Sequence, residues 1–93
     1  MAHQLFALGR IMVTRDAQQS LTEIGLDPGI LLDRHVSGDF GDLSPEDLEA
    51  NMEALSGDEP GRIVSVYKSP IVVFSVVTES DRSATTILLP DEY

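Results

Sequence analysis

The chain has 93 residues, the size of one domain, and its 16 Asp and Glu against six Lys and Arg give a formal net charge of −10. This charge repels phosphates and anionic lipids, which excludes ordinary nucleic-acid and membrane-surface binding. The absence of Cys excludes disulfides, and apolar runs such as IVVF at 71–74 fall far short of the ~20 residues of a membrane span. We therefore expect a single domain over 1–93 in the cytoplasm.

The first part of the chain predicts a strand and then a helix. Residues 5–14, LFALGRIMVT, are apolar at both alternating positions, as in a strand that is buried on both faces. Apolar residues then recur at helical spacing over 17–24, and Gly25 follows where a helix end favours a left-handed residue. We therefore expect a helix from about residue 16 to this glycine.

Two helices with proline in the first turn should follow. Asp-Pro at 27–28 and Ser-Pro at 44–45 each pair a capping side chain with a residue whose missing N–H costs nothing there. Gly38 ends the first of these helices, and the second carries acids near its positive N-terminal end. Its buried stripe is formed by Leu48, Met52 and Leu55.

The last third of the chain is rich in β-branched residues and predicts strands over 62–68, 71–78 and 84–89. Short turns should join them as an antiparallel meander. The order β-α-α-α-β-β-β predicts an α+β fold with about four mostly antiparallel strands and helices packed on one face. The segment IVVFSVV is apolar on both sides, so its second face is covered either by a helix or by a second copy in a homodimer.

No catalytic or cofactor signature is present, because the chain lacks a Gly-x-Gly-x-x-Gly fingerprint, a phosphate-binding loop and a Gly-x-Ser-x-Gly elbow. His3 and His35 have no second His at metal-binding spacing, and His35 is expected at a helix surface or end. Calcium loops that begin at Asp39 or Asp42 fail because the sixth position is not glycine. We expect no cofactor, no metal and no enzymatic activity.

The main candidate for a functional surface is an acidic run, with eight acidic residues and no Lys or Arg between 36 and 61. At about 100° per residue, its glutamates at 46, 49 and 53 fall on one helix face. Such an array can imitate a phosphate backbone in the basic groove of another protein, and the alternative is a solvated helix surface.

A second cluster, TESDRS at 78–83, combines acids with an arginine that offers a bidentate fork to a carboxylate or phosphate. The alternative is a hairpin turn in which these groups pair locally. The candidate partner-binding residues are Asp39, Asp42, Glu46, Glu49, Glu53, Asp81 and Arg82.

Three segments, LGRI at 8–11, RHVSGDFGDL at 34–43 and above all TESDRSATTILLPDEY at 78–93, carry a resemblance to a known family. The chain resembles small bacterial proteins that are carried on plasmids, prophages and integrative elements and are named plasmid-related or hypothetical proteins. It departs from their pattern at Phe40, where the family has Trp, and at Ser80, where it has Ala. The resemblance implies a habitat, bacterial mobile DNA, and no catalytic site.

Some proteins of this kind are labelled type I restriction endonuclease subunit M. A DNA methyltransferase needs a catalytic Asn-Pro-Pro-aromatic motif, whereas Asn51, the only Asn in the chain, is followed by Met52. Methyl transfer is therefore not expected.

Three readings of the function follow. The leading one is a non-enzymatic protein that binds another protein, such as a host DNA-binding or defence protein, and inhibits or modulates it. The second is a dimeric structural or regulatory module that uses the second face of its sheet. The third is a small enzyme with a site between the loops 38–43 and 78–83.

Overall fold

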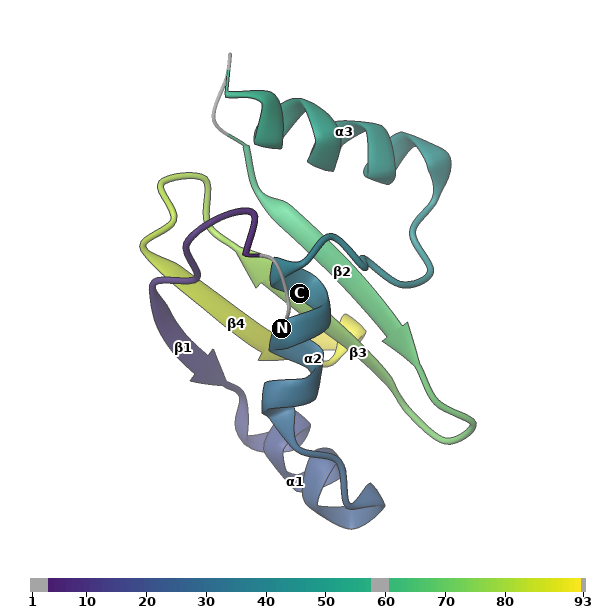
Figure 1. Ribbon diagram of the computed structural model, residues 1–93. Coiled ribbons are helices and arrows are strands. Elements are labelled where there is room, and N and C mark those ends of the chain that lie inside the picture. Colours follow the sequence, from purple (N-terminus) through teal and green to yellow (C-terminus); the bar gives the residue numbers. More distant parts are fainter. Residues whose placement is uncertain (1–3, 58–60, 93) are drawn as a thin grey trace.

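The computed structural model describes residues 4–57 and 61–92, and it has the expected α+β class (Figure 1). The elements are β1 (Arg10–Val13), α1 (Arg15–Ile24), α2 (Pro28–Val36), α3 (Pro45–Ser56), β2 (Ile63–Lys68), β3 (Val73–Thr78), β4 (Ala84–Leu88) and a terminal 3-10 turn, η1 (Pro90–Glu92). His3, Asp58 and Glu59 of the acidic run, and Tyr93 of the C-terminal block, lie outside the described residues.

The four strands form one mixed sheet in the order β1-β4-β3-β2. β2, β3 and β4 form the predicted antiparallel meander, in which Val64 pairs with Val77 and Val77 with Thr86. β1 lies parallel to β4, with Ile11 opposite Thr85, because three helices carry the chain back across the sheet before β2 begins. The expected order of elements and mostly antiparallel sheet are confirmed.

The prediction of a doubly buried strand over 5–14 is wrong. β1 has only four residues and forms an edge of the sheet, where Ile11 and Met12 keep 43% and 42% of their surface exposed. The strand cannot begin earlier because Gly9 has a φ of +66° and turns the chain away. A Cβ at this position would lie 2.4 Å from the carbonyl oxygen of Arg82, so only glycine fits.

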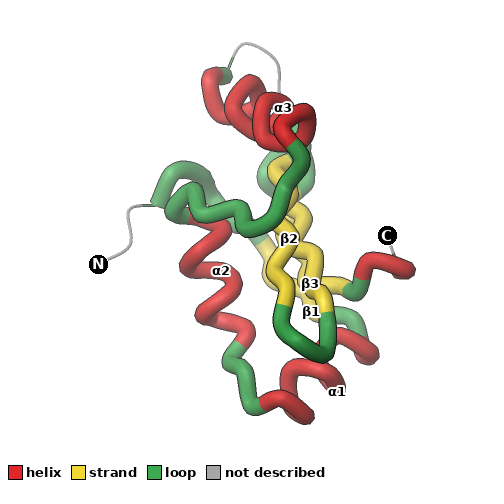
Figure 2. Tube along the Cα trace, turned by 90° about the vertical axis from the view of Figure 1, so that its right-hand side faces the viewer, coloured by secondary structure: helices red, strands yellow, loops and turns green. Residues whose placement is uncertain are grey.

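Helices α1 and α2 cover one face of the sheet. Leu21 of α1 and Leu31 of α2 are buried with Phe74, Val76 and Ile87, whose side chains share that face. A smaller cluster of Phe40, Ala54 and Ile63 attaches α3 at the β2 side. Figure 2 views the sheet from its side, with α2 on one face and η1 on the other. The α-helices therefore pack on one face only, as expected, and the short η1 lies on the other.

The second face of the sheet is partly covered, although none of the described α-helices packs on it. η1 follows β4 and contacts β3, and the side chain of Glu92 accepts hydrogen bonds from the backbone of Leu89 and from the hydroxyl of Thr14. Val77 and Leu88, which belong to this face, keep only 5% and 8% of their surface exposed. A second copy is not needed to shield these two side chains.

α3 is rotated relative to the predicted stripe. Asn51 and Ala54 are its buried residues, whereas Leu48 and Met52 are 45% and 56% exposed. Asn51 sets this orientation, because its amide donates to the carbonyl of Val64 at 2.7 Å and accepts from the same residue's N–H at 3.0 Å. The side chain of Asn51 therefore takes the place of a neighbouring strand beside β2. The predicted stripe is wrong for Leu48 and Met52, whereas Leu55 is partly buried against the Phe40 cluster.

Candidate functional site

α3 is the element that holds the predicted acidic surface. Its first turn is fixed by the hydroxyl of Ser44, which accepts a hydrogen bond from the N–H of Asp47 at 3.2 Å, and Pro45 follows the cap as expected. Gly57 ends the helix with a φ of 91°. Both capping pairs predicted from the sequence act as N-caps, since Asp27 likewise accepts from the N–H of Gly29. The ends of the helix are therefore well defined.

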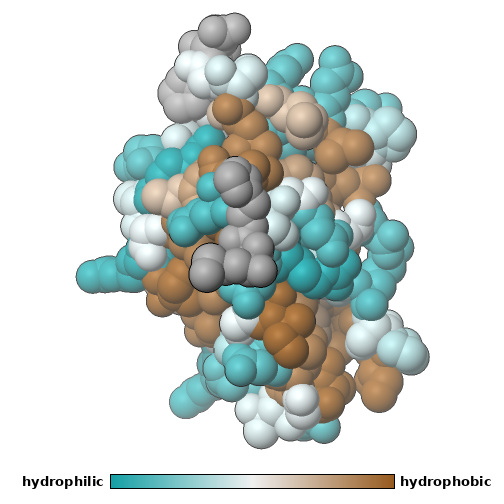
Figure 3. Space-filling view, in the orientation of Figure 1, coloured by the Kyte–Doolittle hydropathy of each residue, from teal (hydrophilic) through white to brown (hydrophobic). Residues whose placement is uncertain are grey.

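The carboxylates of Glu46, Glu49 and Glu53 are exposed, and no hydrogen bond or ion pair reaches them from the described residues. Leu48 and Met52 are exposed on the same helix. Figure 3 shows apolar surface beside hydrophilic surface over α3, at the top of the molecule. We call these five residues the α3 surface. It combines negative charge with apolar contact area, which a purely solvated helix face lacks.

Asp39 is held within the fold and does not present a free charge. Its carboxylate accepts two hydrogen bonds from the guanidinium of Arg34, at 2.7 and 3.2 Å, and its carbonyl accepts from the hydroxyl of Tyr67 at 2.6 Å. The hydrogen bond from Arg34 lowers the pKa of the Asp39 carboxyl below its ordinary value. Asp42 is exposed, and its backbone N–H donates to Val66 at the edge of β2.

Arg82 also has a structural role, because its guanidinium bonds to backbone carbonyls. It sits in the β3–β4 turn with a φ of 61°, and its guanidinium donates to the carbonyls of Gly61 at 2.7 Å and of Ala54 in the last turn of α3 at 3.3 Å. It donates to two carbonyls of its own turn as well, those of Glu79 and Ser80. The guanidinium is therefore occupied by backbone oxygens, as in the alternative of local pairing within the turn, and it ties this turn to α3.

Asp81, the remaining candidate, has its carboxylate turned to its own loop. It accepts a hydrogen bond from the N–H of Ser83 at 3.0 Å, and hydrogen bonds from Ser83 lower the pKa of the carboxyl. Among the described residues, no hydrogen bond or ion pair joins the loop 38–43 to the loop 78–83. The structure therefore brings Glu46, Glu49 and Glu53 together on α3 and leaves the other candidates in two separate loops.

The structure contains a buried row of hydrogen bonds centred on His35, which the sequence did not predict. His35 lies in the last turn of α2, at the helix end as expected, but it has no exposed surface, so the alternative of a surface position is wrong. Its Nδ1 lies 2.5 Å from the hydroxyl of Ser65 and its Nε2 lies 2.9 Å from that of Thr78. The hydroxyls of Thr78 and Thr85 are 2.7 Å apart, and Thr85 donates to the carbonyl of Leu8. Five residues from five segments are thereby joined: the loop before β1, α2, β2, β3 and β4.

The carbonyl of Leu8, at the end of this row of hydrogen bonds, determines which group donates in each of them. Because a carbonyl can only accept, Thr85 donates to Leu8, so Thr78 donates to Thr85 and His35 donates through Nε2–H to Thr78. Nδ1 then accepts from Ser65. Burial lowers the pKa of His35 to about 4, which keeps the imidazole neutral at neutral pH. A neutral, inaccessible pair of Ser and His holds the fold together and cannot act on a substrate.

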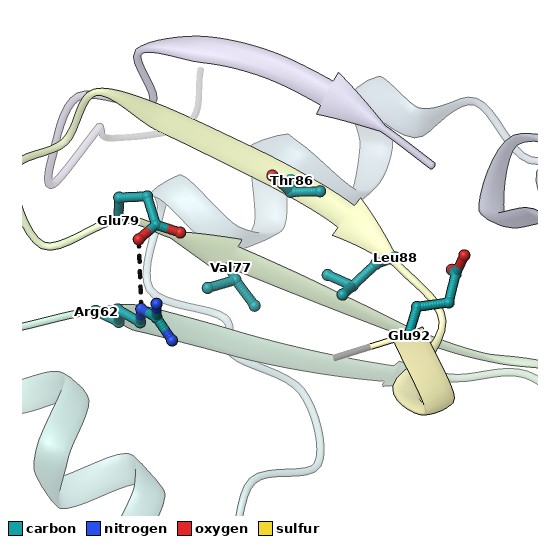
Figure 4. Close-up of a pocket in the computed structure, with 6 residues that line it drawn as sticks. All are labelled: Arg62, Val77, Glu79, Thr86, Leu88 and Glu92. Carbon is teal, nitrogen blue, oxygen red and sulfur yellow. Dashed lines mark ion pairs between the residues drawn. The ribbon is translucent and has the colours of Figure 1, made fainter. Parts of the chain in front are cut away.

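The second sheet face carries a shallow pocket of about 200 Å³, drawn in Figure 4. Val77 and Leu88 lie between polar groups, with Arg62 and Glu79 near one end and Glu92 near the other. Arg62 Nε lies 3.4 Å from a carboxylate oxygen of Glu79, and both side chains are about half exposed. The pocket is wide open and offers room for one apolar side chain of a partner.

Within the described ranges, no group of three or more His, Cys, Asp or Glu side chains is placed to hold a metal ion. None of the helices in that part of the chain is long and apolar enough to cross a membrane. Comparisons with protein-family models, with curated proteins and with solved structures find no match to this chain. The interpretation of the α3 surface rests on its own geometry and chemistry.

Proposed function

We propose that the protein acts by binding another protein through the α3 surface and performs no catalysis. The observation that carries this proposal is that three carboxylates, which form no ion pair with any residue the structure describes, share a single helix with two exposed apolar side chains. A solvated face needs only the charges. Exposed Leu48 and Met52 supply apolar area that is buried in a complex, while the carboxylates select a partner of opposite charge.

The partner that this chemistry fits is a protein with a basic groove. Glu46 and Glu53 are seven residues apart, so they span about 10 Å along the helix axis, with Glu49 between them. A row of negative charges on a rigid rod resembles a stretch of phosphate backbone. We therefore propose that the target is a DNA-binding or defence protein of a bacterial host, in the cytoplasm, whose nucleic-acid groove α3 occupies. The resemblance to proteins of plasmids and prophages supports this choice.

The test begins with capture of partners from host lysate by the tagged protein at low and high salt, followed by binding assays with each purified candidate. The key variant replaces Glu46, Glu49 and Glu53 by Gln. A matched control neutralises three exposed acids elsewhere, Glu23, Asp33 and Asp91, so that net charge changes equally. Circular dichroism establishes that each variant is folded.

We expect a basic DNA-handling protein whose binding weakens with salt, is reduced at least about tenfold by the α3 variant, and is little changed by the control. A Leu48→Ser variant should weaken the same binding without altering its salt dependence, because it removes apolar contact and no charge. If the α3 variant and the control bind equally, placement of the charges does not matter and the proposal fails.

A further inference from the structure

The two edges of the sheet differ in whether their outward backbone groups have hydrogen-bond partners. At the β2 edge, Asn51 satisfies both backbone groups of Val64, and Val66 donates to the carbonyl of Phe40 and accepts from the N–H of Asp42. This edge is closed to further strands. Closing a sheet edge prevents unwanted pairing with other chains. An edge that remains open in the same molecule is therefore a place where pairing is tolerated or used.

The β1 edge is open. The N–H group of Arg10 donates to the carbonyl of Ser83, just before β4, and that of Thr14 donates to Ile87 in β4. Strand geometry directs the peptide groups of Ile11 and Val13 the other way. Over the described part of the chain, no hydrogen bond from outside the sheet reaches these two residues. Figure 1 shows β1 at the margin of the sheet with no element beyond it. Apolar side chains, Ile11 and Met12, are exposed on both sides of this edge.

We propose that two copies of the chain pair along β1, in antiparallel orientation, to form one continuous sheet of eight strands. The register follows from the free groups. When Met12 faces Met12 of the second copy, Ile11 of each copy faces Val13 of the other, and each of these pairs exchanges two hydrogen bonds. Every outward peptide group of Ile11 and Val13 is then satisfied.

Charge favours a second copy at this edge. The chain has a net charge of −10, yet residues 4–15 contain Arg10 and Arg15 and no acid. The carboxylate of Glu92, which accepts a hydrogen bond from the hydroxyl of Thr14, reaches this edge at the position that faces Arg10 of the other copy in the proposed register, so it meets an opposite charge. In the proposed register Arg10 faces Thr14 of the other copy, so no like charges are directly opposed across the strands. The pairing needs nothing from α3 and is independent of the proposed function.

The dimer is expected to be weak. Stable complexes typically bury about 1,200 Å² or more, and pairing of two four-residue strands buries less. The dissociation constant of the dimer should therefore be micromolar or higher. The test therefore covers high protein concentrations. It also uses a covalent trap, because weak association can be captured by a bond that forms only in the correct geometry.

The covalent trap uses the absence of Cys from the chain. Met12 and its counterpart form a non-hydrogen-bonded antiparallel pair, whose Cα atoms lie about 4.5 Å apart, within the range of a disulfide. Met12→Cys should therefore convert to a covalent dimer under mild oxidation. Ile71→Cys is the matched control, since Ile71 is 83% exposed in the β2–β3 turn. We expect the Met12 variant to crosslink at least about tenfold faster.

Sedimentation equilibrium provides a second, non-covalent measurement. We expect a concentration-dependent species of twice 10.1 kDa for the unmodified protein, an apparent dissociation constant at least about tenfold higher for Ile11→Lys, and no change for Ile71→Lys. The proposal is overturned if the protein stays monomeric to about millimolar concentration, if Ile11→Lys dimerises as well as the original chain, or if both cysteine variants crosslink at one rate. The cysteine comparison remains decisive should Ile11→Lys fail to fold.

Discussion

Burial of His35 should make the stability of this protein depend on pH in a defined direction. The imidazole has no exposed surface, and its pKa falls from 6.5 to about 4 because burial disfavours the charged form. Above pH 6.5 neither the folded nor the unfolded chain carries this proton. As the pH falls below 6.5 the unfolded state takes it up first, and the folded state is destabilised relative to it.

The size of the effect follows from linkage. A difference of about 2.5 pKa units at about 1.36 kcal/mol per unit gives a loss of about 3 kcal/mol between pH 6.5 and pH 4. This loss is a large share of the roughly 5–14 kcal/mol expected for a chain of this length. The chain also carries 16 acidic residues, so the His35 contribution must be isolated from every other source of pH dependence.

His35→Gln provides that isolation, because an amide can donate to Thr78 and accept from Ser65 without titrating. Both proteins carry His3→Gln, so that at most one imidazole is present. Urea unfolding is measured from pH 7.5 to pH 4.5, and the difference in free energy of unfolding between the two proteins is plotted. We expect this difference to fall by between about 2 and 3 kcal/mol towards low pH, whatever its value at neutral pH. Parallel pH curves would refute the assignment of a neutral, buried imidazole.

Four further substitutions test the packing of the loops and of α3, each by urea unfolding. Asn51→Ala should cost about 1–3 kcal/mol, because both backbone groups of the partly buried Val64 lose their hydrogen-bond partner. Gly41→Ala should cost several kcal/mol, since its Cβ would meet a β2 carbonyl, whereas Gly57→Ala, with nothing near, should cost about 1–2 kcal/mol for its left-handed backbone alone. Arg82→Lys should lose about 1–3 kcal/mol, because an ammonium cannot reach all four carbonyls.

Local signals in the sequence were sufficient for the type and order of the helices and strands, although not for the extent of β1. The side chains of Asp27 and Ser44 accept hydrogen bonds from N–H groups in the helical turns that they begin. Their role as N-caps can therefore be predicted from neighbouring residues alone. The meander of β2, β3 and β4 was likewise readable, because short connections leave few ways to arrange three strands. The acidic face of α3 followed from helical spacing alone.

Residues whose partners are distant in the sequence could not be assigned this way. His35 is buried because hydroxyls from β2 and β3 meet its two nitrogens, and nothing near it in the chain signals this. Asn51 turns inward because the edge of β2 needs a donor and an acceptor. Hydrophobic periodicity favoured Leu48 and Met52 at the interface instead. Their exposure is what makes α3 a candidate binding surface, so the failed prediction and the candidate site have one cause.

The two proposed surfaces lie at opposite edges of the sheet, β1 at one and α3 beside β2 at the other. Three strand spacings of about 4.8 Å separate the edges by about 14 Å, so substitutions at the two surfaces should act additively on binding. In an eight-stranded dimer, seven such spacings place the outer β2 strands about 34 Å apart. The dimer would thus present two acidic helices to a target with two basic grooves. Ile11→Lys should then weaken binding to a dimeric target and leave binding to a monomeric one unchanged, a pattern that neither surface produces alone.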